Sequence, residues 1–411
     1  MNKSTLINEL GQLPANEVQS TFESFIRGSV RNLISGVMAE EVSLLCGAKH
    51  HPNDSDYKRA GTSPGLVLLD GESVPISKPR VRKTVKGKTT ETVLSSYTAA
   101  QNTDKLHEQI LLGLTAGVST RDQKKLKPQT KGISKSQVSR LWVEAGGELL
   151  TEFRSIDIAK KDWVALMLDG IFLAKETVAI CALGIDSDGR KHMLDFQLGS
   201  SENLEVCKGL MQRLKDRDFE IPEERRLLAV LDGSKALEGA VLAYFPNAVI
   251  QRCLIHKERN LKGYLPRKYH PELRGYFDRL RKAQGLEAAK EIYKELYRFV
   301  KSRNAQATNS LLEAGDTFFG LYRLEVPSTL NTTFLNTNVI ENSYRNVRAK
   351  IGKVSRWRDE TMQAPRWLAL ALTEAQKGFR QINAHEDIPE LIKALNVDNE
   401  LTALDIDELT K

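Results

Sequence analysis

The chain has 411 residues, of which 41% are hydrophobic, and its 60 Lys and Arg outnumber its 53 Asp and Glu to give a formal net charge of +7. This length indicates two or three domains with ordinary hydrophobic cores. The sequence lacks an apolar run of about 18 residues and an N-terminal signal core, and its four cysteines are widely spaced. We therefore expect a cytoplasmic protein with no disulfide framework and no membrane partner.

Positive charge is concentrated in one segment of the chain. Residues 78–140 contain 14 Lys and Arg but 4 Asp and Glu. A basic segment on an otherwise near-neutral chain indicates a polyanion partner, and a solvated basic surface is an equally good interpretation of the charge alone.

Residues 1–100 are expected to combine a helical region with a basic arm. Weak helical periodicity comes first, and a polar loop follows over 49–65. His50 and His51 lie in that loop, and we interpret them as loop residues because adjacent side chains rarely share one metal ion. Residues 77–88 hold six cations and no anion, which predicts an extended arm that lies along phosphates. Its candidate DNA contacts are Arg80, Arg82 and Lys83.

Residues 101–155 have the outline of a helix-turn-helix module. One apolar helix ends at Gly117, Ser119 and Thr120 are candidate N-caps of the next, and a further helix follows Ser134. The start of the last helix contacts DNA in such modules, whereas a plain helical bundle is the alternative. Together with the basic charge, this outline predicts a DNA-binding domain. Its candidate contacts are Lys135, Ser136, Gln137, Ser139 and Arg140.

From residue 160 the pattern becomes that of an α/β domain. Three β-rich runs are followed by alternating helices and strands, so 160–264 is predicted to form a mixed sheet in the order of an RNase H-like core. Helical sequence continues over 265–335 and again over 336–382. The acidic tail, 383–411, is expected to be solvated and partly disordered.

Two apolar strands of this domain end on an aspartate followed by a glycine. These are Asp169-Gly170 in VALMLDG and Asp232-Gly233 in LAVLDG. A carboxylate in that position is costly unless its charge is compensated. In the predicted core the two strands are neighbours, so the carboxylates converge and require a cation. Oxygen ligands suit Mg²⁺ or Mn²⁺, and a third carboxylate would complete a two-metal site for phosphoryl transfer.

Three motifs in order give a specific resemblance. LMLDG, AVLDGSKAL with the following YFPNAVIQRCLIHKERN, and TNVIENSYRNVRAK are similar to segments of mutator-type bacterial insertion-sequence transposases. This is a DDE family with an RNase H-like catalytic core, and the resemblance covers about 100–380. It implies that 265–335 is an α-helical insertion domain between the first part of the core and its final helices. Cys207 and Asp218 depart from the pattern, since the family often has Trp and Gly there.

The resemblance also implies a set of site residues. Asp169, Asp232 and Glu341 correspond to the catalytic triad, which would bind two Mg²⁺ or Mn²⁺ ions. Cys253 and His256 form a C-x-x-H pair that the family shares, but a zinc site would need a second pair. We expect Cys253 to pack in the core and His256 to lie near the active site, where it contacts phosphate or orients a carboxylate.

Cations follow both of these motifs. Lys257, Arg259 and Lys262 fit an approach to DNA or a solvated helix face equally well. Arg345 and Arg348 lie on the same helix face as Glu341. We interpret this last pair as a phosphate clamp, and a salt bridge to Glu341 is the alternative.

The function that this resemblance implies is transposition of DNA. The chain would bind the terminal inverted repeats of an insertion sequence, cleave double-stranded DNA and join it to target DNA, as a homodimer at least, in a bacterial nucleoid. Two alternatives remain: a nuclease or resolvase that cuts without joining, and a catalytically silent DNA-binding regulator.

Overall fold

The structure is a computed structural model with mixed α/β architecture. It divides into two compact units, Met1–Ala145 and Gly146–Lys411, which are described separately. None of the helices in the described part of the chain is both long and apolar enough to cross a membrane. The described residues are 7–8, 11–69, 72–101, 108, 112–113, 116, 135–174, 177–351, 354, 357, 362–401, 404 and 406–409.

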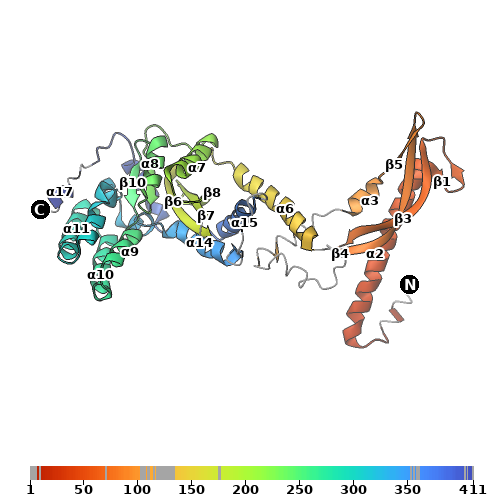
Figure 1. The fold of residues 1–411 in the computed structure, drawn as a ribbon, viewed down its shortest axis with the longest axis horizontal. Helices are drawn as coiled ribbons and strands as arrows, with labels where there is room; N and C mark the ends of the chain where they lie inside the picture. Colours follow the sequence, from red (N-terminus) through yellow and green to blue (C-terminus); the bar gives the residue numbers. More distant parts are fainter. Residues whose placement is uncertain are drawn as a thin grey trace. The chain divides into compact units, whose positions relative to one another are not determined.

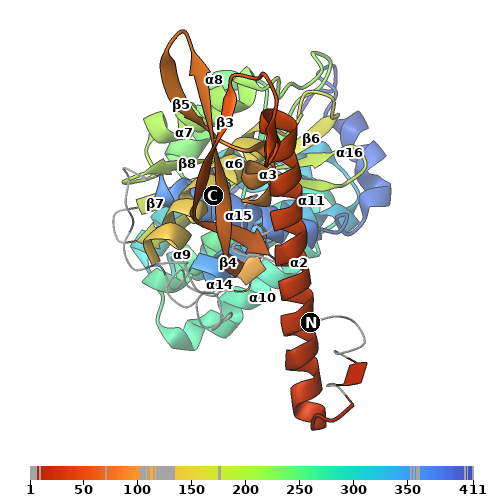
Figure 2. The same ribbon diagram turned by 90° about the vertical axis from the view of Figure 1, so that its right-hand side faces the viewer.

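The first unit combines one long helix with a three-stranded antiparallel sheet. Helix α2 lies along the sheet, whose order is β3-β4-β5 (Figures 1 and 2). The core between them contains Met38, Val42, Val67, Ile76 and Val81. The elements are α2 (Ala15–Cys46), β1 (Gly47–Ala48), β2 (His51–Pro52), β3 (Tyr57–Leu69), β4 (Glu72–Val85), β5 (Lys88–Thr92) and α3 (Ser95–Ala100).

This sheet corrects two expectations about the N-terminal part. Residues 49–65, predicted as a loop, contain β2 and the first half of β3, and 77–88 lie in the paired strands β4 and β5 rather than in a separate arm. The pairing of β3 with β4 shifts register between Arg59 and Thr62. Such an irregularity changes which side chains face the core, so the alternation that predicts a strand is hidden in the sequence.

The predicted helix-turn-helix module lies mostly outside the described residues. Its last helix is α6 (Lys135–Ser155), which runs across the boundary between the two units. Ser139 and Arg140 are exposed on this helix. Lys135, Ser136 and Gln137 belong to the same helix, but their side chains are outside the description.

The second unit holds a five-stranded mixed sheet in the order β10-β9-β6-β7-β8. β6, β7 and β8 form an antiparallel meander. β9 pairs in parallel with β6, and β10 pairs in parallel with β9. Parallel neighbours need crossover connections, which α7 and α8 supply. The strands are β6 (Trp163–Ala174), β7 (Thr177–Asp186), β8 (Lys191–Gly199), β9 (Leu228–Leu231) and β10 (Val249–Arg252).

Helices cover both faces of this sheet. α7 and α8 pack on one face over an apolar cluster that includes Leu166, Leu168 and Leu231, and α14 and α15 lie on the other face (Figure 1). The main helices are α7 (Leu204–Asp216), α8 (Lys235–Tyr244), α9 (Leu254–Tyr264), α10 (His270–Arg281), α11 (Gly285–Lys301), α12 (Ala305–Leu312), α13 (Asn331–Phe334), α14 (Asn338–Ile351), α15 (Gln363–Lys377), α16 (Ile388–Ala394) and α17 (Ile406–Leu409).

Helical turns occupy the segment 265–335 between β10 and α14. Besides α10 to α13, it contains short 3-10 turns. These are η1 (Arg267–Tyr269), η2 (Gly315–Phe319), η3 (Tyr322–Leu324) and η4 (Ser328–Leu330), and a further turn, η6 (His385–Asp387), precedes α16.

The acidic tail is not solvated throughout, which corrects part of our expectation. Ile388, Leu391 and Leu395 are fully buried at helical spacing, and Arg226 donates hydrogen bonds to the carbonyls of Asn396 and Val397. The apolar face of this segment is hard to recognise in the sequence, because acidic residues separate its apolar positions, which recur at helical spacing.

The two departures from the family pattern have different structural settings. Cys207 is buried in the core under the sheet. Asp218 follows α7 with φ of +57°, a left-handed conformation in which glycine has no steric cost. The family's preference for Gly therefore has a backbone reason, and the short polar side chain of Asp tolerates the same conformation.

Candidate active site

Asp169 and Asp232 come from two neighbouring strands of the central sheet. Asp232 directly follows β9 as predicted, whereas Asp169 lies inside β6, which continues to Ala174 beyond the predicted strand end. Leu168 of β6 pairs in parallel with Leu231 of β9, so the next residue of each strand emerges beside the other. The Ser234 amide donates a hydrogen bond of 2.8 Å to Asp232 Oδ1, which fixes this carboxylate where α8 begins. The structure thus brings together the first two predicted site residues.

The glycines that follow these aspartates leave room for charged neighbours. Gly233 has φ of +108°, and a Cβ there would overlap the guanidinium of Arg252. A Cβ on Gly170 would lie 3.0 Å from Oε2 of Glu202. Larger residues at either position would displace side chains that border the two carboxylates.

Asp169 is buried among negative charges. It is 5% exposed, and burial raises its pKa to about 8, with further contributions from the charges of Asp232 and Glu341 and a smaller one from Glu202. Within the described ranges, Asp169 forms no ion pair with Lys or Arg. A carboxylate in this environment binds a proton or needs a cation.

Asp195 on β8 is a second buried aspartate, but its charge is compensated by arginines. It is fully buried, and Arg213 Nε lies 2.9 Å from its Oδ2. Arg154 and Arg217 approach it at 3.7 and 3.9 Å. Asp195 is therefore a paired structural charge, whereas Asp169 has no such arginine among the described residues and is available to a ligand.

Glu341 reaches the aspartates from α14, in the first turn of that helix. The Tyr344 hydroxyl donates a hydrogen bond of 2.7 Å to the backbone carbonyl of Asp169, which fixes α14 against β6. The Thr337 hydroxyl donates to Glu341 Oε1 at 3.2 Å. The third predicted residue is therefore held close enough to influence the pKa of Asp169.

Arg259 and His256, both on α9, are the partners of Glu341. Arg259 Nη2 lies 3.3 Å from Glu341 Oε2, and His256 Nε2 lies 3.6 Å from Oε1. Burial lowers the pKa of His256, which outweighs the raising effect of Glu341 and Asp232. Arg259 also approaches His256 Nε2 at 3.3 Å as a donor, which is consistent with a neutral imidazole.

Cys253 is fully buried at the start of α9, as we expected of a core residue. Its sulfur accepts a hydrogen bond from the Thr337 amide at 3.3 Å and lies 3.4 Å from the Thr337 hydroxyl oxygen. Cys253 and His256 therefore both contact Thr337, because the hydroxyl also lies 3.4 Å from His256 Nδ1. Because Thr337 also contacts Glu341, the C-x-x-H pair lies next to Glu341.

The cations that follow this pair differ in exposure, since Arg259 is exposed and Lys257 is buried. Lys257 is fully buried, and its ammonium binds Glu313 at 3.1 Å and the carbonyl of Ser310 at 2.6 Å. Lys262 is paired with Glu258 at 2.5 Å. Both roles suggested by the sequence are therefore wrong for Lys257, whose partner Glu313 is the C-cap of α12 and is distant from it in the sequence.

Arg345 and Arg348 are exposed on α14. The alternative interpretation was a salt bridge to Glu341, yet in the described part of the chain Glu341 pairs with Arg259 and His256. Glu341 is therefore not the partner of either arginine.

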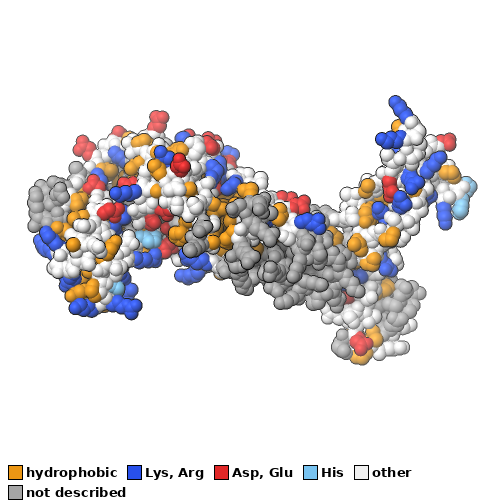
Figure 3. Space-filling model, in the orientation of Figure 1, with side chains coloured by type: hydrophobic (Ala, Val, Ile, Leu, Met, Phe, Trp, Pro, Cys, Tyr) orange, Lys and Arg blue, Asp and Glu red, His pale blue; other side chains and the backbone are white. Residues whose placement is uncertain are grey.

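The DNA contacts predicted within residues 77–88 lie on β4. Arg80 is paired with Glu91 at 2.6 Å, Lys83 lies over the Tyr57 ring at 5.0 Å, and Arg82 is exposed. Figure 3 shows Lys and Arg side chains gathered over the projecting β4–β5 hairpin.

The donor set at the sheet edge fits a hard divalent cation. Carboxylates surround Asp169, and hard cations such as Mg²⁺ prefer oxygen ligands. Among the residues described, no three His, Cys, Asp or Glu side chains are gathered closely enough to share one ion, and Glu341 is turned to Arg259. The site therefore has the chemistry for a cation, and Glu341 must exchange partners to coordinate one.

Sequence reasoning missed Glu202, Arg252 and Tyr344. Glu202 lies in the polar stretch GSSEN before α7, where no apolar run ends on it. Tyr344 stands at i+3 from Glu341, a helical neighbour that could have been noticed. Arg252 closes β10, so its place beside β9 could have been found from the predicted sheet order.

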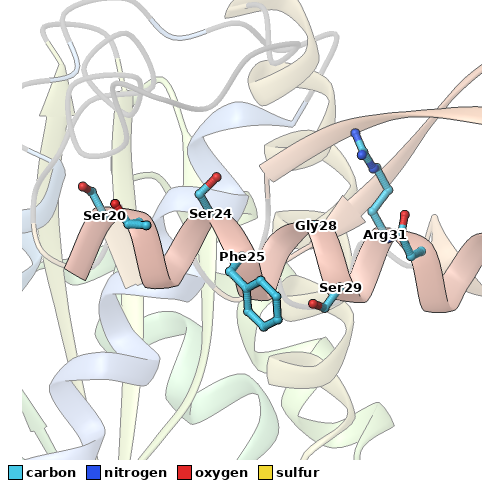
Figure 4. A pocket seen from close by; sticks show the side chains of 8 residues that line it. Ser20, Ser24, Phe25, Gly28, Ser29 and Arg31 are labelled. Atoms are coloured by element: carbon cyan, nitrogen blue, oxygen red, sulfur yellow. The ribbon is translucent and has the colours of Figure 1, made fainter. Parts of the chain in front are cut away.

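In its described lining, a hollow along α2 lacks the carboxylates that characterise the site at Asp169 and Asp232. Figure 4 shows side chains that line it, and all of them come from the one helix. The described residues of its lining include no carboxylate, histidine or cysteine.

Comparison with known proteins identifies the family of this chain. The profile of the mutator family of transposases matches residues 1–381. The chain belongs to the mutator family of transposases. The family match includes the whole central sheet and the three carboxylates.

Named relatives of this transposase-family chain come from several bacteria. The transposase for insertion sequence element IS905 of Lactococcus lactis is 25% identical over 85% of this chain and 87% of its own length. The transposase for IS256 in transposon Tn4001 of Staphylococcus aureus is 26% identical over 82% of this chain and 88% of its own length. The transposase for ISRM5 of Rhizobium meliloti is 30% identical over 40% of this chain and 43% of its own length.

Proposed function

We propose that this chain binds the terminal inverted repeats of an insertion sequence and carries out cation-dependent DNA cleavage and strand transfer by a DDE mechanism. The observation that carries the proposal is the buried Asp169, which lacks a basic partner in the described ranges and lies beside Asp232 and Glu341. Family membership and the named relatives support transposition as the biological role.

The arrangement of the second unit supports an RNase H-like core. An antiparallel meander of three strands, extended in parallel by two more, gives the order β10-β9-β6-β7-β8. In such a core the first and fourth strands are adjacent and carry the first two acids. The helical segment 265–335 then serves as an insertion domain that delivers α14 and Glu341.

Asp169, Asp232 and Glu341 would hold two Mg²⁺ or Mn²⁺ ions. When bound, the ions supply Lewis-acid stabilisation to the attacking and leaving oxygens of the phosphodiester. Water hydrolyses the bond at the element's end, and the freed 3′-hydroxyl then attacks a phosphate of target DNA. The chain contributes rigidity, because β6 holds Asp169, the end of β9 holds Asp232, and Tyr344 holds α14 against β6.

Basic surfaces would hold the DNA. Four exposed arginines are suited to contact phosphate. They are Arg82 on the β4–β5 hairpin, Arg140 near the start of α6, and Arg345 and Arg348 on α14. Arg80 and Lys83 would serve by shaping the hairpin as well as by their charge, since each already has a partner. Binding of two element ends implies a homodimer at least, acting on the bacterial chromosome.

The decisive experiment replaces one acid at a time. Glu341→Gln should lower Mg²⁺-dependent cleavage by about 10³-fold or more, because one ligand of the cation site is lost. Repeat binding should be unchanged, since removal of a negative charge does not weaken attraction to phosphate. Cleavage of labelled repeat DNA and binding by gel shift are measured separately.

Two other glutamates near Glu341 in the sequence serve as matched controls. Glu325 is exposed and accepts a hydrogen bond from the Leu286 amide, and Glu360 lies outside the described residues. Normal cleavage by Glu341→Gln, together with loss in Glu325→Gln or Glu360→Gln, would show that the triad is misassigned. Cleavage without joining of pre-cleaved ends would favour the nuclease alternative, and repeat binding without cleavage would favour the regulator.

A further inference from the structure

The side chain of Arg252, the last residue of β10, lies against the residue that follows Asp232. A Cβ on Gly233 would overlap the Arg252 guanidinium, and Gly233 has φ of +108°, a conformation that favours glycine. In the same turn the Ser234 amide donates a hydrogen bond of 2.8 Å to Asp232 Oδ1. The guanidinium therefore packs directly on the backbone turn that orients the Asp232 carboxylate.

Arg252 is held from its other side by α12. Its two terminal nitrogens donate to the two carboxylate oxygens of Glu313, the C-cap of this helix, at 3.2 and 2.8 Å. Lys257 binds the same carboxylate at 3.1 Å and the Ser310 carbonyl at 2.6 Å. Two parallel hydrogen bonds between an arginine and a carboxylate fix the plane of the guanidinium as well as its position. Glu313 thus determines how Arg252 lies on Gly233.

The helical segment that contains α12 also clamps the strand that carries Arg252. Gln251 is fully buried, and its side-chain oxygen accepts a hydrogen bond of 2.7 Å from the Leu321 amide. A Cβ on Gly320 would overlap the carbonyl of Ile250, so the two backbones pack directly on each other. These uncharged contacts already attach the segment to β10. Attachment alone therefore does not account for a buried guanidinium at this position.

We propose that Arg252 is a positioning residue for Asp232, and that Glu313 sets the orientation of Arg252. This inference rests on the proposed function, because it takes Asp232 as a catalytic acid. It gives the helical segment a part in the reaction besides the delivery of α14. Through Glu313 and Arg252, the segment fixes the turn that follows β9.

Arg252→Lys in the full chain tests this role, because lysine keeps a positive charge beside Glu313 but has no planar group to lie on Gly233. Mg²⁺-dependent cleavage at saturating repeat DNA should fall about 10-fold or more. The affinity for Mn²⁺, measured by electron paramagnetic resonance without DNA, should fall by a similar factor. Binding of repeat DNA should be unchanged, since Arg252 is buried.

Arg225→Lys is the matched control for the loss of a buried arginine. The Arg225 side chain is 7% exposed, compared with 6% for Arg252, and it pairs with Asp162 immediately before β6. A loss of stability should appear in both variants as a lower melting temperature in chelator. Cleavage and Mn²⁺ affinity should fall in Arg252→Lys alone.

Glu313→Gln tests the second half of the proposal. It should lower cleavage and Mn²⁺ affinity in the same way, and its combination with Arg252→Lys should add little, because the two residues act through one chain of contacts. Additive losses in the double variant would show that Glu313 does not act through Arg252.

Each other outcome has a definite meaning. Cleavage and Mn²⁺ affinity of Arg252→Lys equal to those of the wild type overturn the inference and leave the proposed function intact. The same holds if Arg225→Lys loses as much cleavage as Arg252→Lys for an equal fall in melting temperature, because the role of Arg252 is then structural. Normal cleavage by Asp232→Asn overturns the proposed function, and this inference with it.

Discussion

At the scale of single residues, Asp169 is buried and is repelled by neighbouring carboxylates. Both effects should make the free energy of unfolding depend on pH. Its pKa is raised to about 8 by burial first and then by neighbouring carboxylates. The folded state therefore holds a proton that the unfolded chain releases near pH 4. This contribution to the free energy of unfolding is complete below about pH 4 and is lost as pH rises to about 8.

Asp169→Asn should remove this pH dependence. Without divalent cations, its melting temperature should exceed that of the wild type by several degrees, and the gain should grow from pH 4 towards pH 8 because the amide has no charge to desolvate. Thermal unfolding in chelator across this range measures the difference, with Glu205→Gln as the control for charge removal, since Glu205 is exposed in the first turn of α7. A gain that shrinks as pH rises would contradict the burial of an ionisable group at this position.

At the scale of elements, the β4–β5 hairpin is the clearest candidate for contact with DNA. Its two-residue turn, Lys86-Gly87, has positive φ at both positions, as a tight hairpin turn requires, and Arg82, Lys86 and Lys88 are exposed around it. A two-stranded ribbon of this kind fits the major groove of DNA. The hairpin therefore presents its charge on a paired framework and not on a free arm.

Loss of this charge should weaken DNA binding through phosphate contacts. Arg82→Ala combined with Lys88→Ala should lower affinity for repeat and unrelated DNA alike, and reduce the slope of log affinity against log salt by about one for each lost contact. Fluorescence anisotropy over a salt series measures both quantities. The control is Lys290→Ala with Lys294→Ala on α11, two lysines paired within their own helix. Unchanged slopes in the hairpin variant would remove β4 and β5 from the interface.

Elements also differ in how well the sequence predicts them. The strands that carry Asp169 and Asp232 are continuous apolar runs, and their burial on both faces makes them easy to recognise. The sheet of the first unit could not be predicted in the same way, because one face is polar and a register shift hides the period. Lys257 illustrates a second limit, since its burial depends on Glu313, a partner that becomes a neighbour only in the folded chain.

At the scale of the whole molecule, the division into two compact units suggests that DNA binding and cation binding belong to different parts of the chain. α6 crosses the boundary, and its C-terminal part belongs to the second unit, where Phe153 packs on Phe196 at a ring distance of 5.7 Å. A fragment of residues 135–411 keeps this helix complete. We expect it to fold, to bind Mn²⁺ and to lose repeat-specific DNA binding.

Circular dichroism, Mn²⁺ titration and gel shifts on that fragment check the three expectations. Repeat binding should instead appear in a fragment of residues 1–155, which contains the basic segment and all of α6. Full repeat binding by 135–411 would mean that the recognition surface lies in the second unit.

The position of Glu341 has a consequence for protein synthesis. The ribosome completes the DNA-binding segment and both aspartates well before α14, since 109 residues separate Asp232 from Glu341. A chain released early would therefore hold the element's ends without cutting them, and would compete with finished chains for the same DNA. Under the proposed function, incomplete translation would therefore restrain the mobility of the element.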